Sequence, residues 1–266
     1  MSTKSLAGQI GGIAVEHGFS IDLGEPDYEI GLIADGSSSY VACGWLVGDF
    51  DDSIGTATRR PTERPFFRPI SLDPRLARLS VNLACGPVDE RTVLDPMTGT
   101  GGFAMEAVTM GRNCLAIDMD PVMVSGTQQN VSWASRNIPS EADFQIICGD
   151  ATKLDEIIPK ELHGNISGVV LDPPYGRNSH GSQSHFDLIS ETISGLRAVV
   201  SASAKLVLII PINPSEGGEI DLLHGDWDDF SRMLTNSGAE IIDHWQEHVH
   251  GSLSRLILLA TIFPQD

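Results

Sequence analysis

The sequence predicts an α/β fold in which seven strands form a doubly wound, mostly parallel sheet that ends in an antiparallel hairpin. Two observations carry this prediction. From residue 91 onward, apolar runs alternate with amphipathic helical patterns, and such alternation favours a parallel sheet. The last two apolar runs are joined more directly, as in a hairpin. The expected strands are 91–95, 113–118, 143–148, 166–171, 204–210, 240–245 and 255–263, and the expected helices lie near 101–110, 121–137, 185–200 and 226–237.

The first 58 residues are expected to form a small α+β segment that ends in a linker. Apolar residues recur at helical spacing within 5–18, which predicts a short helix. Three further runs are expected to be strands, namely 19–23, 28–33 and 40–47. The stretch 49–61 is rich in Asp, Ser, Gly and Thr, a composition typical of a linker. The main domain is therefore expected over 59–266, with Asp73 capping its first helix.

Composition restricts the environment in which the protein works. No stretch approaches the apolar length of a membrane span, and no signal-type segment follows the first residues, so we expect a cytoplasmic protein. The cysteines are widely spaced and form no C-x-x-C pair, so we expect neither a disulfide nor a metal site. They are Cys43, Cys85, Cys114 and Cys148.

The net charge of −19 argues against nucleic acid as a partner, because Lys and Arg normally neutralise the phosphates. The charge is unevenly distributed, however. One basic segment holds six arginines against two acids, at positions 59, 60, 64, 68, 75 and 78. A nucleic-acid partner therefore stays open. The acidic balance with only four lysines is also what high intracellular salt favours, which we hold as a hypothesis.

The first strand of the main domain runs into a glycine-rich stretch, Asp95-Pro96-Met97-Thr98-Gly99-Thr100-Gly101-Gly102. Glycines here let the backbone approach a ligand and open a helix. The spacing Gly99-x-Gly101-x-x-Ala104 also fits a relaxed dinucleotide fingerprint, so a nicotinamide enzyme is an alternative. Two carboxylates favour S-adenosylmethionine instead: Asp95 suits its cationic methionine end, and Asp150 suits an adenine amino group.

Carboxylates stand at the ends of four successive predicted strands: Asp95, Asp118, Asp150 and Asp172. In a doubly wound sheet these ends converge on one crevice. Each acid alone is better explained as a helix cap or turn former, but four in succession, with glycines after the first and Pro-Pro-Tyr after the last, favour a ligand site. The fourth opens Asp172-Pro173-Pro174-Tyr175, a corner rich in acceptors beside an aromatic ring. Such a corner suits a planar group that carries an exocyclic amine.

The order of these motifs resembles the amino-methylating class I methyltransferases, which have a Rossmann-like fold. With Arg64-Pro65-Phe66-Phe67-Arg68-Pro69-Ile70-Ser71-Leu72 before them and His250-Gly251-Ser252-Leu253-Ser254-Arg255 after them, the chain resembles the archaeal and eukaryotic tRNA guanosine-10 N2-methyltransferases. Asp-Pro-Pro-Tyr also occurs in DNA adenine and cytosine methylases, so a DNA or other-RNA amino methyltransferase is an alternative. A non-catalytic RNA-binding or scaffold subunit is another.

The resemblance implies three sets of site residues. S-adenosyl-L-methionine would be held by Asp95, Pro96, Thr98, Gly99, Thr100, Gly101, Asp118, Met119, Gly149, Asp150, Ala151 and Asp172. The catalytic set would be Asp172, Pro173, Pro174 and Tyr175. The RNA substrate would contact Arg64, Phe67, Arg68, Arg177, His250 and Arg255.

The resemblance also implies partners. Members of the family carry an N-terminal THUMP module that binds RNA, and residues 5–47 resemble only its C-terminal part. We therefore expect a tRNA substrate, captured with an incomplete THUMP module, by the basic segment or through a partner. A small zinc-binding activator protein that extends the sheet is a further implied partner.

Overall fold

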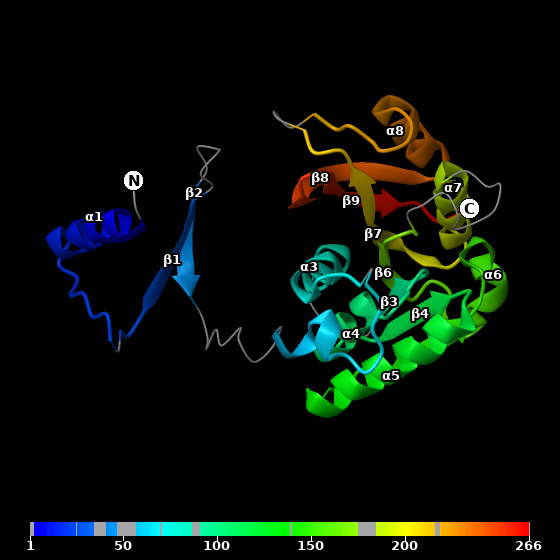
Figure 1. The fold of residues 1–266 in the computed structure, drawn as a ribbon, viewed down its shortest axis with the longest axis horizontal. Coiled ribbons are helices and arrows are strands. Elements are labelled where there is room, and N and C mark those ends of the chain that lie inside the picture. Colours follow the sequence, from blue (N-terminus) through cyan, green and yellow to red (C-terminus); the bar gives the residue numbers. More distant parts are fainter. Residues whose placement is uncertain are drawn as a thin grey trace. The chain divides into compact units, whose positions relative to one another are not determined.

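The computed structural model describes residues 3–24, 26–34, 41–46, 57–69, 71–86, 91–138, 140–174, 185–215 and 219–265 (Figure 1). The chain divides into two compact units, Met1–Asp52 and Ser53–Asp266. Within the described ranges, no helix has both the length and the apolar character needed to cross a membrane.

The described residues of the smaller unit form one helix and one antiparallel strand pair. They are α1 (Thr3–Glu16), β1 (Glu29–Ala34) and β2 (Val41–Leu46), with Glu29 opposite Leu46. The strand expected at 19–23 is wrong, because these residues form no strand. Phe19, Ile21 and Leu23 are all exposed. Alternating hydrophobicity describes only one face of a strand, and backbone pairing needs a neighbour that the pattern does not supply.

The larger unit is built on a seven-stranded sheet with the order β5-β4-β3-β6-β7-β9-β8. The first five strands in this order are parallel, and β9 runs antiparallel to both β7 and β8. The predicted mostly parallel sheet with a terminal hairpin is therefore confirmed. The strands are β3 (Thr92–Asp95), β4 (Cys114–Asp118), β5 (Phe144–Cys148), β6 (Ile166–Leu171), β7 (Val200–Ile212), β8 (Ala239–His250) and β9 (Leu253–Ile262).

Helices cover both faces of this sheet. The α-helices are α3 (Pro74–Cys85), α4 (Gly102–Thr109), α5 (Pro121–Asn137), α6 (Leu154–Ile157), α7 (His185–Leu196) and α8 (Trp227–Asn236). Short 3₁₀ turns occur at Ala57–Arg59, Pro61–Glu63, Ala151–Lys153 and Lys160–Leu162. Asp73 caps α3 by accepting a hydrogen bond from the backbone N–H of Arg75 at 2.8 Å, as its place before Pro74 predicts.

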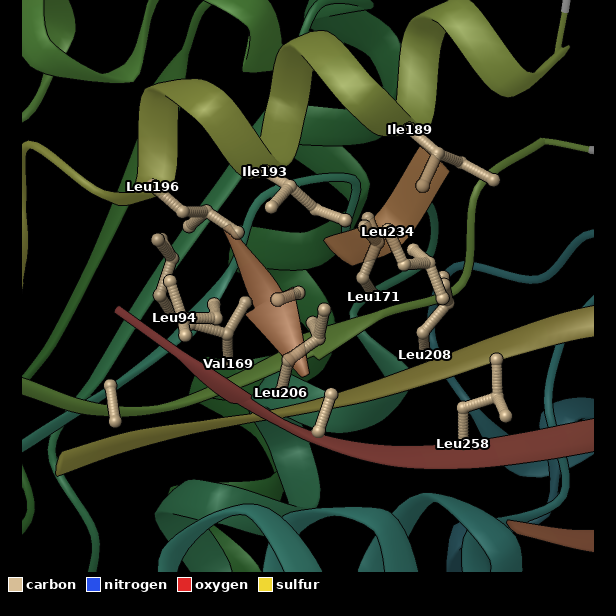
Figure 2. Close-up of a cluster of buried hydrophobic side chains, with 14 of the residues drawn as sticks. Leu94, Val169, Leu171, Ile189, Ile193, Leu196, Leu206, Leu208, Leu234 and Leu258 are labelled. Carbon is tan, nitrogen blue, oxygen red and sulfur yellow. The ribbon is translucent and has the colours of Figure 1, made fainter. Parts of the chain in front are cut away.

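The core lies in two layers because successive strand residues point to opposite faces. Leu94 belongs to a first layer that also contains buried residues of α6, α7 and α8, whereas its neighbour Val93 belongs to a second layer with buried residues of α3, α4 and α5. Figure 2 shows Ile189 and Ile193 of α7 pointing down onto strand residues of the first layer. Both faces are therefore buried, which explains why the strands read as continuous apolar runs rather than as alternating ones.

Candidate active site

The four acids predicted at strand ends lie in a row at one edge of the sheet. Asp95 and Asp118 are the last residues of β3 and β4, Asp150 lies two residues after β5, and Asp172 directly follows β6. Because β5, β4, β3 and β6 are parallel neighbours in that order, the acids succeed one another along their carboxyl ends. Open α/β sheets bind their ligands at this edge.

The glycine-rich turn, residues 96–101, connects β3 to α4 with two residues in the left-handed region. Gly99 has a φ of 53° and Gly101 a φ of 80°, which residues with a Cβ rarely adopt. A Cβ on Gly101 would also approach the Thr127 methyl to 2.8 Å. Within the turn, the Gly101 N–H donates to the Thr98 carbonyl at 2.8 Å. Gly101 therefore allows the turn to pack closely against α5, and the approach of a ligand to this backbone stays a prediction.

Asp95 is a fully buried carboxylate at the base of this turn, with an exposed fraction of 0%. Burial raises its pKa to about 8, and the charges of Asp118 and Asp172 add to the rise. The Thr98 side chain and the Met97 backbone offset part of it. Both groups lie near Asp95 but outside hydrogen-bond geometry, so neither Asp95 oxygen nor the buried Thr98 hydroxyl has a hydrogen-bond partner among the described residues. These orphaned acceptors suit a cationic ligand group.

Asp118 and Asp150 already accept backbone hydrogen bonds. Asp118 accepts from the N–H groups of Gly99 at 2.8 Å and Asp120 at 2.9 Å, which ties the end of β4 to the glycine-rich turn. Asp150 accepts from the Thr152 N–H at 2.9 Å, as a cap would. A carboxylate oxygen can accept more than one hydrogen bond, so these backbone contacts do not by themselves prevent a ligand from binding the same acids.

The remaining predicted cofactor residues lie along the same edge. Met119 is 58% exposed just after β4, and the Gly149 N–H donates to the Asp118 carbonyl at 2.9 Å. A Cβ on Gly149 would approach the terminal methyl of Ile157 to 2.6 Å, so any larger residue there would require the Ile157 side chain to move. Ala151 and Pro96 are buried.

Asp172 and the prolines after it form the acceptor corner. Asp172 Oδ1 is buried and has no hydrogen-bond partner among the described residues. Burial raises the pKa of Asp172 to about 7, and the charge of Arg255 offsets part of the rise. Pro173 is buried and Pro174 half-buried. Tyr175 and Arg177 lie outside the described residues.

Arg255 and His250, predicted to contact substrate, lie on the terminal hairpin. The Arg255 guanidinium on β9 forms an ion pair with Glu247 on β8 at 3.0 Å. His250 is exposed at the end of β8. No sequence motif includes Glu247, and only the register of β8 against β9 places this residue opposite Arg255.

Arg64 is a correction to the predicted substrate-binding set. Its side chain is buried, with hydrogen bonds to the carbonyls of Arg59 at 2.9 Å and Leu72 at 3.3 Å. Burial lowers its pKa to about 10. The guanidinium is thus buried and bound to two backbone carbonyls, although its Nη1 has no partner among the described residues, so Arg64 is not exposed to contact RNA in this structure. The basic segment is therefore partly a structural element.

Among the other residues of the basic segment, some are likewise buried in the structure and others are exposed to solvent. We call residues 57–69 the strap. Arg59 is buried in a two-pronged ion pair with Glu106 of α4, at 2.7 and 3.0 Å. Arg68 and Phe67 are exposed, and the Arg68 guanidinium lies 4.6 Å from the centre of the Phe66 ring. The outer side of the strap thus keeps the residues that can meet a substrate.

Glu106→Ala is expected to destabilise the protein by about 3–5 kcal/mol, because it leaves the buried Arg59 charge without its partner. Urea unfolding followed by circular dichroism measures the effect. Asp229→Ala is the matched control: it removes an ion pair with Arg232 whose side chains are 67% and 73% exposed, and should cost less than about 1 kcal/mol. Equal losses for the two variants would show that the Arg59–Glu106 pair contributes little.

The comparisons with known proteins agree with this geometry. The family model described as UPF0020: RMKL-like, methyltransferase domain matches residues 61–215, more than half of the chain. A tRNA (guanine(10)-N2)-dimethyltransferase of Pyrococcus abyssi is 29% identical over 257 residues, 95% of this chain and 67% of the relative. The enzyme of the same name from Methanothermobacter thermautotrophicus is 31% identical over 199 residues, 74% of this chain and 51% of the relative. The chain thus spans from half to two thirds of these relatives.

Two solved structures share the fold. TrmN from Thermus thermophilus has a TM-score of 0.53 and 18% identity, covering 99% of this chain and 68% of its own. The glycopeptide N-methyltransferase MtfA complexed with S-adenosylmethionine has a TM-score of 0.51 and 13% identity, covering 75% of this chain and 100% of its own. At these identities they establish the architecture alone.

The matches confirm the resemblance that the motifs predict and favour S-adenosylmethionine over the nicotinamide alternative. The residues present also fit that cofactor. Asp95 and Thr98 offer unused buried acceptors to its cationic end, and the glycine-rich turn leaves room for close approach. The chain belongs to the RMKL-like methyltransferase domain family, UPF0020, and its cofactor is S-adenosyl-L-methionine.

Proposed function

We propose that this protein methylates the exocyclic N2 amine of a guanosine in tRNA, at position 10. The observation that carries the proposal is the pair of buried acceptors, Asp95 and Asp172, at the carboxyl ends of the neighbouring strands β3 and β6. The first suits the cofactor's cation and the second suits an amine. The names of the curated relatives supply the nucleotide and its position.

The exocyclic amine is a weak nucleophile because its lone pair is delocalised into the guanine ring. When bound, S-adenosylmethionine supplies an electrophilic methyl group. Asp172 and the Pro173 carbonyl accept the two amine hydrogens, which lets the nitrogen pyramidalise and aims its lone pair at the methyl. The cofactor, held by Asp95 and the glycine-rich turn, would supply the methyl group and leave as the thioether, and the methylated nitrogen would then give up one proton. Asp172, whose pKa burial raises to about 7, is suited to take that proton.

The substrate residues have separate proposed roles. Tyr175 would stack on the target base once it leaves its own stack. Arg177, Phe67, Arg68, His250 and Arg255 would contact the RNA. Among the described arginines of the basic segment, Arg60, Arg68 and Arg75 are exposed and can neutralise phosphates. RNA capture by the smaller unit and a zinc-binding activator stay predictions that the described residues do not test.

The test uses an unmodified tRNA transcript and labelled S-adenosylmethionine. We expect N2-methylguanosine at position 10 after nuclease digestion and mass spectrometry. A transcript with inosine at position 10, which lacks only the exocyclic amine, should gain no methyl group there. A DNA duplex is the second comparison. Methylation of the inosine transcript at position 10, or of DNA in preference to tRNA, would contradict the proposal. No transfer to any amine would favour a non-catalytic subunit.

A further inference from the structure

We infer that Asn130 is a positioning residue of the cofactor site, which holds the glycine-rich turn in its binding shape and joins it to the strap. Nothing in the sequence motifs marks this residue. It lies in the middle of α5, outside the strand ends and the turn itself. The inference rests on the proposed function only in that it places S-adenosylmethionine at this turn.

The Asn130 side chain is fully buried and makes three hydrogen bonds to backbone atoms of two distant segments. Its Oδ1 accepts from the Phe66 N–H at 2.9 Å, and its Nδ2 donates to the Phe66 carbonyl at 2.8 Å. The second Nδ2 hydrogen goes to the Thr100 carbonyl at 2.8 Å. Both amide donors are thus used, one on the strap and one on the turn.

Neighbouring residues on the same face of α5 support this arrangement. The Thr127 hydroxyl donates to the Gly99 carbonyl at 2.9 Å. Gly126 leaves space for the Phe66 ring, which any Cβ at that position would overlap. Just after the strap, the Ser71 hydroxyl forms a hydrogen bond of 3.0 Å with the Thr100 hydroxyl of the glycine-rich turn. The strap is therefore seated on α5 by shape as well as by hydrogen bonds.

These hydrogen bonds fix the direction of the peptide groups in the glycine-rich turn. Asn130 and Thr127 hold two successive carbonyls, those of Thr100 and Gly99, toward α5. In a trans peptide the N–H points opposite to the carbonyl. The Thr100 N–H, which shares a peptide with the Gly99 carbonyl, is therefore turned away from α5. A turn fixed in this way needs no ordering when a ligand binds, which preserves affinity.

The experiment replaces Asn130 by Asp, which has the same size but presents an oxygen where Nδ2 donates to two carbonyls. Calorimetry at a temperature where the variant is folded should show the dissociation constant for S-adenosylmethionine raised by about 10- to 100-fold. The turnover rate at saturating cofactor should stay within about threefold, because Asn130 acts on binding rather than on the amine. Wild-type affinity in folded Asn130→Asp would overturn the inference.

Asn137→Asp is the matched control. It lies on the same helix, is exposed, and its Nδ2 donates only to the Trp133 carbonyl at 3.0 Å. It should bind S-adenosylmethionine as the wild type does, and an equal loss in both variants would also overturn the inference. If Asn130→Asp does not fold, the comparison of Thr127→Val with Thr127→Ser replaces it. Val lacks the hydroxyl that donates to the Gly99 carbonyl, whereas Ser keeps it. Equal affinities of these two variants for S-adenosylmethionine would contradict the inference. Cofactor binding is read without RNA, so a failed tRNA assay leaves this test intact.

Discussion

An Asp172→Ala variant is expected to lose tRNA methylation by about 10³-fold while its affinity for S-adenosylmethionine changes by no more than a few-fold. Asp172 Oδ1 is a buried acceptor without a partner among the described residues, so its removal leaves the amine hydrogens unbound. Its raised pKa shows that the protein gains no stability from this charge. Single-turnover methylation and calorimetry measure the two effects separately.

Asp172→Asn is the graded comparison, because its side chain keeps one acceptor oxygen. Its activity should lie between those of Asp172→Ala and the wild type. Simultaneous loss of methylation and cofactor binding in both variants would instead mean that Asp172 is structural.

The pH profile gives a further check on Asp172. Because its pKa is about 7, the carboxylate becomes protonated as the pH falls through that value. The wild-type rate should therefore decline below about pH 7 at saturating cofactor. Asp172→Asn cannot be protonated there, so its rate should lack this acidic limb. An identical limb in the variant would assign the titration to another group.

Asp95→Asn is expected to have two opposite effects: weaker cofactor binding and a more stable empty protein. The variant loses a charge-assisted contact to the cationic end of S-adenosylmethionine, which should raise the dissociation constant by about 10- to 100-fold. It also removes a carboxyl group whose pKa burial raises to about 8, with smaller contributions from the charges of Asp118 and Asp172.

The sign of the stability effect follows from that raised pKa. The folded protein holds the Asp95 proton more tightly than the unfolded chain, so the wild type loses stability as the pH rises from about 4 to about 8. Asp95→Asn should lack this loss, and the gap between variant and wild type should widen to a few kcal/mol by pH 8. Below pH 8, cofactor binding should also release a proton from wild-type Asp95, which calorimetry in buffers of different ionisation enthalpy detects.

Asp143→Asn serves as the control, because this acid is exposed just before β5. Its stability should follow the wild-type curve at every pH. Parallel stability curves for Asp95→Asn and the wild type would show that Asp95 is not held as a buried carboxyl group. Unchanged cofactor affinity would remove Asp95 from the proposed cofactor site.

Much of the main domain could be predicted from the chain because the relevant signals are local. A buried parallel strand is an apolar run, and its end is marked by the polar residue that leaves the sheet. The acids Asp95, Asp118, Asp150 and Asp172 could therefore be assigned to strand ends before their neighbours were known. Chain order then implied one common edge, since parallel strands all end on the same side.

The order of the last two strands in the sheet could not be predicted from local sequence patterns. The sequence predicted a terminal hairpin but could not tell which of its strands would pair with β7. The structure inserts β9 between β7 and β8, and this places Arg255 beside Pro211 rather than at the outer edge. Burial decides the choice: most of β9 is buried, whereas β8 is largely exposed. A strand that must be covered on both faces lies inside the sheet.

The burial of the arginines in the basic segment and the role of Asn130 could be found only from the tertiary structure. A run of arginines predicts a positive surface, but Arg59 is buried against Glu106, 47 residues away, and Asn130 meets Phe66 across 64 residues. Such contacts leave no local pattern, because any buried carboxylate or amide can satisfy a donor from any segment that the fold brings near it. The strands, the acidic edge of the sheet and the chemistry that this edge favours could all be inferred from local sequence patterns. Only the packing of the strap on α4 and α5 decided which charges face outward and which residue holds the glycine-rich turn, because long-range hydrogen bonds are a property of the folded chain.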